Sequence, residues 1–331
     1  MEGLSAIVGQ DRAVTRLRTA LAAGKTHHAY LFEGPDGVGK RTTALALAMA
    51  WNCETRPGDG CGTCPACRKI DAGTHPDVVV FAVFNEEGKV KDQTDRVRQL
   101  LATLMFPPHE GRARVVIVDP AHELNETASN VLLKTLEEPP PGTNFVLVTT
   151  AASQLLTTIR SRCQRVVFNA LPESVVGDLL VSAHGIDRAA AEQAAALAGG
   201  SLGRALALAS SDELPKRAAR VSRLFSAARG RKTQEMLDAA SEAAGEREES
   251  LATLRMMWVA YHDAVLLASG REAGTGAGRV EARLLADRVP TPSMLAAIRA
   301  IDEAEESIEG FVSPQLTLER LLLRLNRLGA A

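Results

Sequence analysis

Residues 29–51 read AYLFEGPDGVGKRTTALALAMAW, an apolar run followed by a glycine-rich turn and a long stretch with helical character. Gly34 and Gly39 stand at the spacing of a phosphate-binding loop, and Lys40 follows the second glycine. Such glycines let backbone N–H groups wrap phosphate oxygens, while the helix N-terminus and the lysine favour negative charge. Because the loop lies between a strand and a helix, we favour a nucleotide-binding α/β domain over an ordinary glycine turn.

Two positions, one after the loop and one after a later strand, depart from the pattern of P-loop proteins that hydrolyse nucleotide. The residue after the lysine usually offers a hydroxyl to Mg²⁺, but here it is Arg41. Thr42 could substitute, although it lies about 100° further around the helix. A second apolar run ends in Asp119, where an acid that reaches Mg²⁺ is expected, but Pro120 stands where a general base would follow. We therefore expect little or no ATP hydrolysis, and whether the loop binds ATP or ADP with Mg²⁺ stays open.

Short apolar runs alternate with helical patterns over the first half of the chain, which favours a parallel sheet covered by helices on both faces. The expected strands are Ala29–Phe32, Val78–Phe81, Val115–Val118, Phe145–Thr149 and Arg165–Phe168. The expected helices are Ala13–Ala23, Arg41–Trp51, Asp95–Phe106, Glu126–Leu136 and a short one near Leu155–Ile159.

Only helical patterns remain after Leu171-Pro172. Three short helices are expected at Pro172–His184, Ala189–Leu197 and Leu202–Ala209, followed by a longer helical part rich in Ala and Leu. Within that part, the glycine-rich stretch Gly270–Gly278 predicts a mobile loop. We therefore expect an α/β domain at residues 1–170, a small helical domain at 171–211 and an all-helical domain at 212–331.

Four of the five cysteines lie close together with the spacing C-x7-C-x2-C-x2-C: Cys53, Cys61, Cys64 and Cys67. Pairs spaced as Cys-x2-Cys can direct two thiolates at one tetrahedral ion, and the turn-rich residues 56–60 let the first cysteine fold back to complete the set. The pattern predicts a closed, structural Zn²⁺ site. The alternatives are a redox-active cysteine pair or chance clustering.

Composition limits the remaining function classes. Lys plus Arg number 38 and Asp plus Glu 40, so the chain has a net charge of −2 and does not coat nucleic acid by bulk charge. Aromatic residues make up 4%, too few for a base-stacking platform. The sequence contains neither a long apolar run nor a basic, apolar N-terminal leader, so we expect a cytoplasmic protein without a membrane partner.

Two arginines are candidates for contacting phosphate. Arg162 follows the fourth expected strand in Thr158-Ile159-Arg160-Ser161-Arg162-Cys163 and could reach a neighbouring subunit's nucleotide. Arg204 starts a helix of the small domain in Gly200-Ser201-Leu202-Gly203-Arg204 and could reach the nucleotide of its own chain. Taken alone, each is more often a solvated surface charge.

Together these motifs resemble the delta-prime subunits of the bacterial DNA polymerase III clamp loader, which belong to the AAA+ family. The resemblance runs nearly end to end. It is carried by Ile7-Val8-Gly9-Gln10, the cysteine module after the loop helix, His75-Pro76-Asp77, Leu132-Leu133-Lys134-Thr135-Leu136-Glu137-Glu138-Pro139-Pro140, Thr149-Thr150, Ser161-Arg162-Cys163, Gly200-Ser201 with Arg204, and Pro314-Gln315-Leu316.

The resemblance implies an AAA+ P-loop domain with a zinc module at 53–67, a helical lid and a helical collar that assembles into a ring. It implies ATPase (gamma/tau) and delta subunits, the sliding clamp and primed DNA as partners. It assigns Arg162 as a finger acting in trans on a neighbour's ATP. The implied nucleotide-binding residues are Gly34, Gly37, Gly39, Lys40, Thr42, Asp119, Thr150 and Arg204.

Two rival interpretations remain. The first is the gamma/tau-type ATPase motor subunit, which would need a hydroxyl after Lys40 and a glutamate after Asp119, and both are absent. The second is a zinc-dependent nucleic-acid-binding module, which would need a basic face around the cysteines. Only Arg56, Arg68 and Lys69 lie near them, so this second interpretation is the weaker one.

Overall fold

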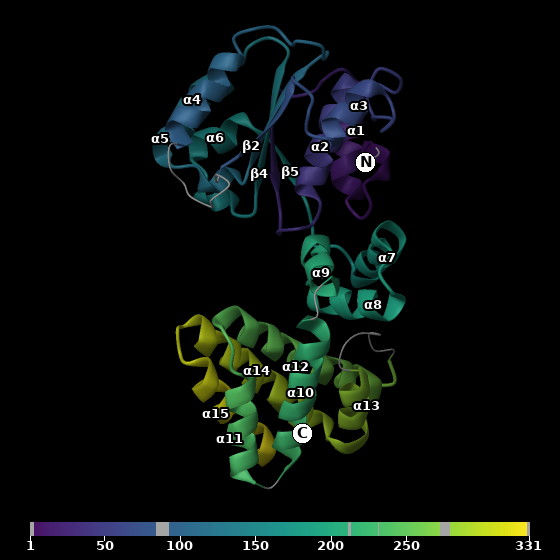
Figure 1. Ribbon diagram of the computed structural model, residues 1–331, viewed down its shortest axis with the longest axis vertical. Helices are drawn as coiled ribbons and strands as arrows, with labels where there is room; N and C mark the ends of the chain where they lie inside the picture. Colours follow the sequence, from purple (N-terminus) through teal and green to yellow (C-terminus); the bar gives the residue numbers. More distant parts are fainter. Residues whose placement is uncertain (1–2, 84–92, 211–212, 231, 272–278, 330–331) are drawn as a thin grey trace. The chain divides into compact units, whose positions relative to one another are not determined.

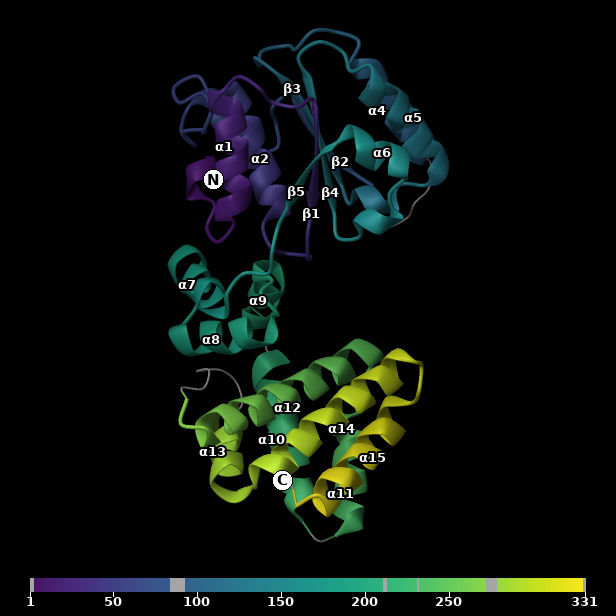
Figure 2. The same ribbon diagram turned by 180° about the vertical axis from the view of Figure 1, so that it is seen from behind.

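The computed structural model describes residues 3–83, 93–210, 213–230, 232–271 and 279–329. The chain divides into two compact units, Met1–Leu171 and Pro172–Ala331 (Figures 1 and 2). All strands of the described part lie in the first unit. A further division of the second unit near residue 211 stays a prediction.

The first unit is built on one parallel sheet with the strand order β2-β3-β4-β1-β5. The strands are β1 (Ala29–Glu33), β2 (Val78–Ala82), β3 (Arg114–Asp119), β4 (Thr143–Thr149) and β5 (Gln164–Val167). Residues of the three central strands are almost all buried, because helices cover both faces of the sheet, and this explains their continuous apolar sequence. All five predicted strands are confirmed, each within two residues of its expected ends.

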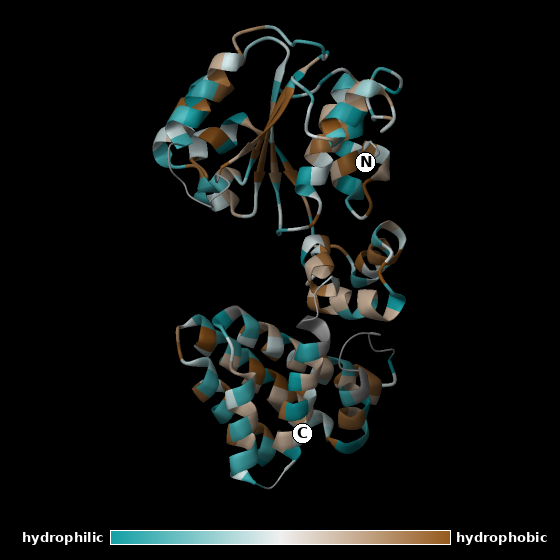
Figure 3. Ribbon diagram, in the orientation of Figure 1, coloured by the Kyte–Doolittle hydropathy of each residue, from teal (hydrophilic) through white to brown (hydrophobic). Residues whose placement is uncertain are grey.

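Two groups of helices cover the two faces of this sheet (Figure 1). One group is α1 (Asp11–Ala22), α2 (Lys40–Asn52) and α3 (Pro65–Asp71); the other is α4 (Gln93–Thr103), α5 (Glu126–Glu137) and α6 (Thr157–Arg162). Successive strand residues enter different cores, since side chains alternate across a strand. Phe32 lies in one core with Leu47 of α2, and its neighbour Leu31 lies in the other with Leu132 of α5. Figure 3 shows the resulting band of hydrophobic strands between helices with polar outer faces.

The bounds of two helices differ from the expectation, and one helix was not expected. The helix expected to continue to Phe106 ends at Thr103, because Pro107 and Pro108 follow and the residue before a proline is disfavoured in helical conformation. The helix expected at Leu155–Ile159 begins only at Thr157, after a short 3-10 turn at Ala152–Gln154. Helix α3 carries Cys67 of the cysteine module (residues 53–67) and extends four residues beyond it. This helix was not predicted, since its seven residues are too few to show a helical period.

The second unit contains only helices in its described part. They are α7 (Glu173–His184), α8 (Arg188–Leu197), α9 (Leu202–Ala209), α10 (Glu213–Arg229), α11 (Thr233–Ala243), α12 (Arg247–Ala268), α13 (Arg279–Arg288), α14 (Thr291–Glu309) and α15 (Pro314–Arg327). The long helix α12 packs against α13 and α14, and α15 packs against α11 and α14. Buried leucines line one face of α15, and the rings of Phe225 and Tyr261 meet 5.4 Å apart in the interior. The three helices expected first in this unit are confirmed.

None of the helices in the described ranges combines the length and the apolar character that crossing a bilayer requires. The predicted mobile loop falls mostly on residues 272–278, which lie outside the described residues.

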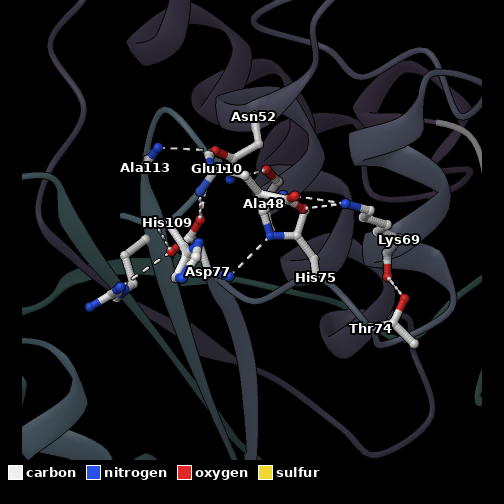
Figure 4. Close-up of polar contacts among 11 residues, drawn as sticks. Ala48, Asn52, Lys69, Thr74, His75, Asp77, His109, Glu110 and Ala113 are labelled. Atoms are coloured by element: carbon white, nitrogen blue, oxygen red, sulfur yellow. Dashed lines mark hydrogen bonds and ion pairs between the residues drawn. The ribbon is translucent and has the colours of Figure 1, made fainter. Parts of the chain in front are cut away.

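A buried aspartate joins the edge of the sheet to the cysteine module (Figure 4). Asp77, just before β2, is fully buried and accepts hydrogen bonds from the backbone N–H groups of His109 (2.7 Å), Glu110 (2.8 Å) and Gly111 (2.8 Å). Its Oδ1 also lies 3.3 Å from a guanidinium nitrogen of Arg114. Burial alone would raise the pKa of Asp77, but these hydrogen bonds lower it to about 2.

The same network reaches both flanks of the cysteine module (Figure 4). Lys69 of α3 donates to both carboxylate oxygens of Glu110, at 2.8 and 2.7 Å. Asn52, the last residue of α2, accepts a 3.0 Å hydrogen bond from Ala113 N–H. His75 Nδ1 accepts from the N–H of Asp77 at 3.1 Å. The His-Pro-Asp motif therefore positions the segment against which the module rests.

We expect Asp77→Asn to lower the free energy of unfolding of the first unit by about 3 kcal/mol, because the amide loses one acceptor and brings donors toward buried donors. Urea unfolding followed by Trp51 fluorescence in a Trp258→Phe background measures this unit separately. The folded-state pKa is depressed, so the carboxylate stabilises above its ordinary pKa of 3.8 and this contribution is lost as pH falls toward about 2. The difference between the two proteins should therefore shrink across that window.

Asp95→Asn is the matched control. Asp95 forms a solvent-exposed pair with Arg98, at 2.9 Å, and its replacement should change stability by less than about 1 kcal/mol. Equal unfolding midpoints for the Asp77 and Asp95 variants would contradict the structural role assigned to Asp77.

Candidate functional site

The phosphate loop connects β1 to α2, and its glycines adopt conformations that other residues rarely take. The φ angles of Gly34, Gly37 and Gly39 are 157°, 67° and 97°. A Cβ at Gly34 would lie 2.3 Å from the carbonyl oxygen of Phe168, so no larger residue fits there. Lys40 folds over the loop, and its Nζ donates to the carbonyl of Gly34 at 2.8 Å and also to that of Pro35.

The acid at the end of β3 faces the start of α2. Asp119 Oδ2 lies 3.8 Å from Nη1 of Arg41, with side chains 19% and 57% exposed. Burial raises the pKa of Asp119, while Arg41 and Lys40 act in the opposite direction. Burial lowers the pKa of Lys40, opposed by Asp36 and Asp119. Lys40 and Asp119 therefore lie close enough to interact electrostatically, as the motifs suggested. The Arg41 guanidinium, which extends from α2 toward Asp119, is a third charged group at this place.

The two hydroxyls after Arg41 differ in their surroundings. Thr42 is exposed at the helix surface. Thr43 is fully buried, and its hydroxyl donates to the carbonyl of Gly39 at 2.9 Å. That hydroxyl is therefore already engaged within the loop.

A histidine that the sequence analysis missed connects the end of β3 to the end of β4. His122 Nδ1 lies 3.2 Å from the hydroxyl of Thr149, and its Nε2 lies 3.2 Å from the hydroxyl of Thr150. A neutral ring satisfies both contacts by donating at one nitrogen and accepting at the other. The predicted site residue Thr150 is thus held by His122, whose only sequence signal is a polar residue soon after a strand end.

The N-terminal segment also fastens the phosphate loop. Gln10 is buried and its amide nitrogen donates to the carbonyl of Val38, in the loop, at 3.2 Å. The same amide exchanges hydrogen bonds with the backbone of Asn169, after β5, at 2.8 and 3.2 Å. The Ile7–Gln10 segment therefore links the loop to the end of the first unit.

The four predicted metal ligands converge. The sulfur atoms of Cys53, Cys61, Cys64 and Cys67 all lie within 4.8 Å of one another. Cys53 and Cys64 are 3.8 Å apart, and Cys61 and Cys67 are 4.0 Å apart. A tetrahedral zinc ion with bonds of about 2.3 Å requires sulfur atoms about 3.8 Å apart, so this donor set fits Zn²⁺.

The surroundings of these sulfurs differ. Hydrogen bonds, first from the Thr55 and Thr63 side chains and then from backbone N–H groups, lower the pKa of Cys61 to about 4. Burial raises the pKa of Cys67 to about 12. A cation would therefore be needed to hold both as thiolates, as in a closed structural site with four sulfur ligands. Cys163 lies on the other face of the sheet, and burial raises its pKa to about 12.

Arg162 lies at the end of α6, and both terminal nitrogens of its guanidinium have partners. Nη1 donates to the carbonyl of Thr158 at 3.1 Å, and Nη2 lies 2.5 Å from Oε1 of Glu137. Its side chain is 36% exposed, so it remains reachable from outside the unit. Glu137, the last residue of α5, was not predicted as a functional residue.

The second predicted arginine, Arg204, lies in the second unit. Ser201 caps α9 by accepting from the N–H of Arg204 at 3.1 Å, and the Arg204 side chain is exposed.

Comparison with known proteins shows which family the first unit resembles. Residues 9–172 match the family described as "DNA polymerase III, delta subunit". DNA polymerase III subunit tau of Escherichia coli (strain K12) is 41% identical over 166 residues, covering 50% of this chain and 25% of that protein. The first unit belongs to the clamp-loader subunit family of DNA polymerase III. Its parallel sheet with a four-cysteine insert, followed by helices in the second unit, is an AAA+-like architecture.

Other relatives of this clamp-loader unit carry related names. DNA polymerase III subunit tau of Bacillus subtilis (strain 168) is 39% identical over 173 residues, covering 52% of this chain and 30% of that protein. Subunit gamma of Buchnera aphidicola is 37% identical over 158 residues, covering 47% of this chain and 42% of that protein. The chain therefore matches only between 25% and 42% of the length of these relatives.

Two of the solved structures that match cover most of this chain at low sequence identity. A DNA polymerase III gamma subunit-related protein of Thermotoga maritima is 20% identical, with a TM-score of 0.43 over 94% of this chain and 98% of that one. The Thermotoga maritima RuvB Holliday junction branch migration motor is 20% identical, with a TM-score of 0.44 over 82% and 85%.

Proposed function

We propose that this chain is a delta-prime-like stator subunit of the clamp loader, which helps place the sliding clamp on primed DNA. In this role it hydrolyses little or no ATP and lends Arg162 to the ATP site of a neighbouring ATPase subunit. The proposed partners are gamma/tau and delta subunits, the sliding clamp and, through the assembled complex, primed DNA. The family match of residues 9–172 supports the assembly, and the residues around Asp119 support the division of labour.

The observation that carries the proposal is the ion pair between Arg41 and Asp119, at 3.8 Å. Hydrolysis of ATP by a P-loop enzyme needs a hydroxyl on Mg²⁺, an acid on Mg²⁺ and a group that orients the attacking water. Arg41 replaces the first group and neutralises the second, while Pro120 replaces the third. Three parts of the hydrolytic site are therefore altered together, whereas the glycines and Lys40 are kept.

The position of Arg162 supports its action in trans. Its guanidinium is oriented by Glu137 and the Thr158 carbonyl, yet over a third of the side chain stays exposed. Arginine acts as a finger by stabilising charge that develops on a transferred phosphoryl group. An arginine that is both oriented and exposed loses little conformational freedom when it meets a neighbour's phosphates. The roles of Thr150 and Arg204 at this chain's own loop belong to the same proposal.

A gamma/tau-type motor subunit is the second candidate. It is favoured by the identities of 37% to 41% with proteins named tau or gamma. A motor would turn over ATP at its own loop, so the two candidates make different predictions for the isolated chain.

We expect no ATP turnover by the purified chain with Mg²⁺ and primed DNA beyond the background given by its Lys40→Ala variant. The reason is the loss of the Mg²⁺ hydroxyl and of the general base. Phosphate release in a coupled assay measures this, and the Lys40→Ala variant identifies contaminating ATPases. Turnover of about 1 s⁻¹ or more that Lys40→Ala abolishes would favour the motor subunit instead.

A further inference from the structure

The residue that follows the loop lysine is the starting point. Arg41 is the second residue of α2, and its guanidinium points to Asp119 across 3.8 Å. A magnesium ion in a P-loop lies between the hydroxyl after the lysine and the acid at the strand end. In this chain the guanidinium extends from the first of those positions toward the second. The charge that Mg²⁺ would contribute there is therefore already supplied by a side chain.

The surrounding residues do not fit the ion. The hydroxyl of Thr43 is engaged by the Gly39 carbonyl at 2.9 Å, and Thr42 is rotated about 100° from the position of Arg41. Mg²⁺ prefers octahedral oxygen ligands and gives up its waters reluctantly, so a site with one already paired carboxylate binds it poorly. Lys40 and Arg41 add two positive charges that repel a divalent cation.

The loop itself keeps the features that receive phosphate. Its glycines have the required conformations, and the Lys40 amine is fixed over the loop by two carbonyls. The Arg41 side chain is 57% exposed, so the N–H groups of its guanidinium that do not face Asp119 can bind a phosphate oxygen. Its planar fork of N–H donors matches two phosphate oxygens, which a metal ion would otherwise neutralise.

We propose that the Gly34–Lys40 loop binds a nucleoside polyphosphate in its metal-free form, with the Arg41 guanidinium taking the place of Mg²⁺. Such a complex has phosphate charge neutralised by Lys40 and Arg41 without the ion that positions a water for attack. The nucleotide is then a structural ligand rather than a fuel. This inference rests on the P-loop geometry and is independent of the role of Arg162.

Calorimetric titration of the full chain with ADP and with ATP tests the proposal, once with excess Mg²⁺ and once with EDTA. For the native chain we expect a lower dissociation constant with EDTA than with excess Mg²⁺, because Mg²⁺ in solution competes with the loop for the metal-free nucleotide. For Arg41→Thr, which restores the hydroxyl and frees Asp119, we expect binding at least about tenfold tighter with Mg²⁺ than with EDTA. Arg98→Thr, a matched change on exposed α4, should behave as the native chain does.

A second measurement does not depend on any variant. With Mn²⁺ as the probe, electron paramagnetic resonance should show Mn²⁺ remaining free in solution or on nucleotide that is not bound to the protein when the native chain binds ADP. Native binding that is at least as tight with Mg²⁺ as with EDTA, an Mn²⁺ ion held by the protein, or no binding of either nucleotide in both conditions would overturn the inference. None of these outcomes alters the expected effect of Arg162 in the assembled loader, so failure here is distinguishable from failure of the stator proposal.

Discussion

Replacing Arg162 by alanine is expected to lower ATP hydrolysis at the adjacent ATPase site of the assembled clamp loader by about 10³-fold. The removed guanidinium would otherwise stabilise charge developing on the transferred phosphoryl group. The chain itself should stay folded, because the side chain is 36% exposed and its ion pair with Glu137 lies at the surface. Single-turnover hydrolysis in a reconstituted loader, triggered by clamp and primed DNA, measures the effect on the neighbour.

Two further variants separate a finger from a general loss of positive charge. Arg160→Ala removes an exposed arginine from the same helix and should leave hydrolysis within about twofold of the native loader. Arg162→Lys keeps the charge but loses the planar fork, so it should rescue only part of the rate. Native turnover in the loader that carries Arg162→Ala would rule out the finger assignment and leave Arg162 as a structural partner of Glu137.

The sheet was predictable because burial on both faces leaves a strong signal in the sequence. Strands such as β3 and β4 consist of apolar residues bounded by polar ones, and their ends were located within two residues. The helix ends were less predictable where local chemistry overrides periodicity, as at Pro107, which stops α4 early. Helix α3 has only seven residues, too few for its buried Ala66, Cys67 and Ile70 to show a helical period in the sequence.

The candidate site was predictable only where chemistry fixes spacing along the chain. The cysteines and the phosphate-loop glycines belong to short local patterns, so the sequence located them directly. Contacts between distant segments could not be obtained this way. His122 meets Thr149 and Thr150 only because β3 and β4 end side by side, and Glu137 meets Arg162 across two helices. From the sequence, Arg41 indicated only that a hydroxyl is missing after the lysine, whereas the structure shows that its guanidinium pairs with Asp119.

Replacing Cys67 by serine is expected to abolish stoichiometric zinc binding and to unfold the cysteine module locally. Cys67 is fully buried, and a serine hydroxyl is a poor ligand for a site built from thiolates. Structural zinc sites of this kind contribute on the order of 10 kcal/mol to the folding of small modules. Metal analysis of the purified protein measures the loss of zinc, and hydrogen exchange over residues 53–71 measures the unfolding. Cys163→Ser, outside the cluster, should keep one zinc ion per chain.

The extent of that unfolding follows from how the module is attached. Helix α2 enters the module directly from the phosphate loop, but Leu47 and Met49 anchor it in the core of the sheet. Exchange should therefore rise beyond Asn52 and not in β3 or β4. The backbone at Asp59 also bonds to Leu4 at 2.9 Å, so the N-terminal turn should lose protection together with the module. Loss of protection throughout the sheet would instead mean that zinc stabilises the whole first unit, and unchanged exchange in the zinc-free variant would show that the module folds without its metal.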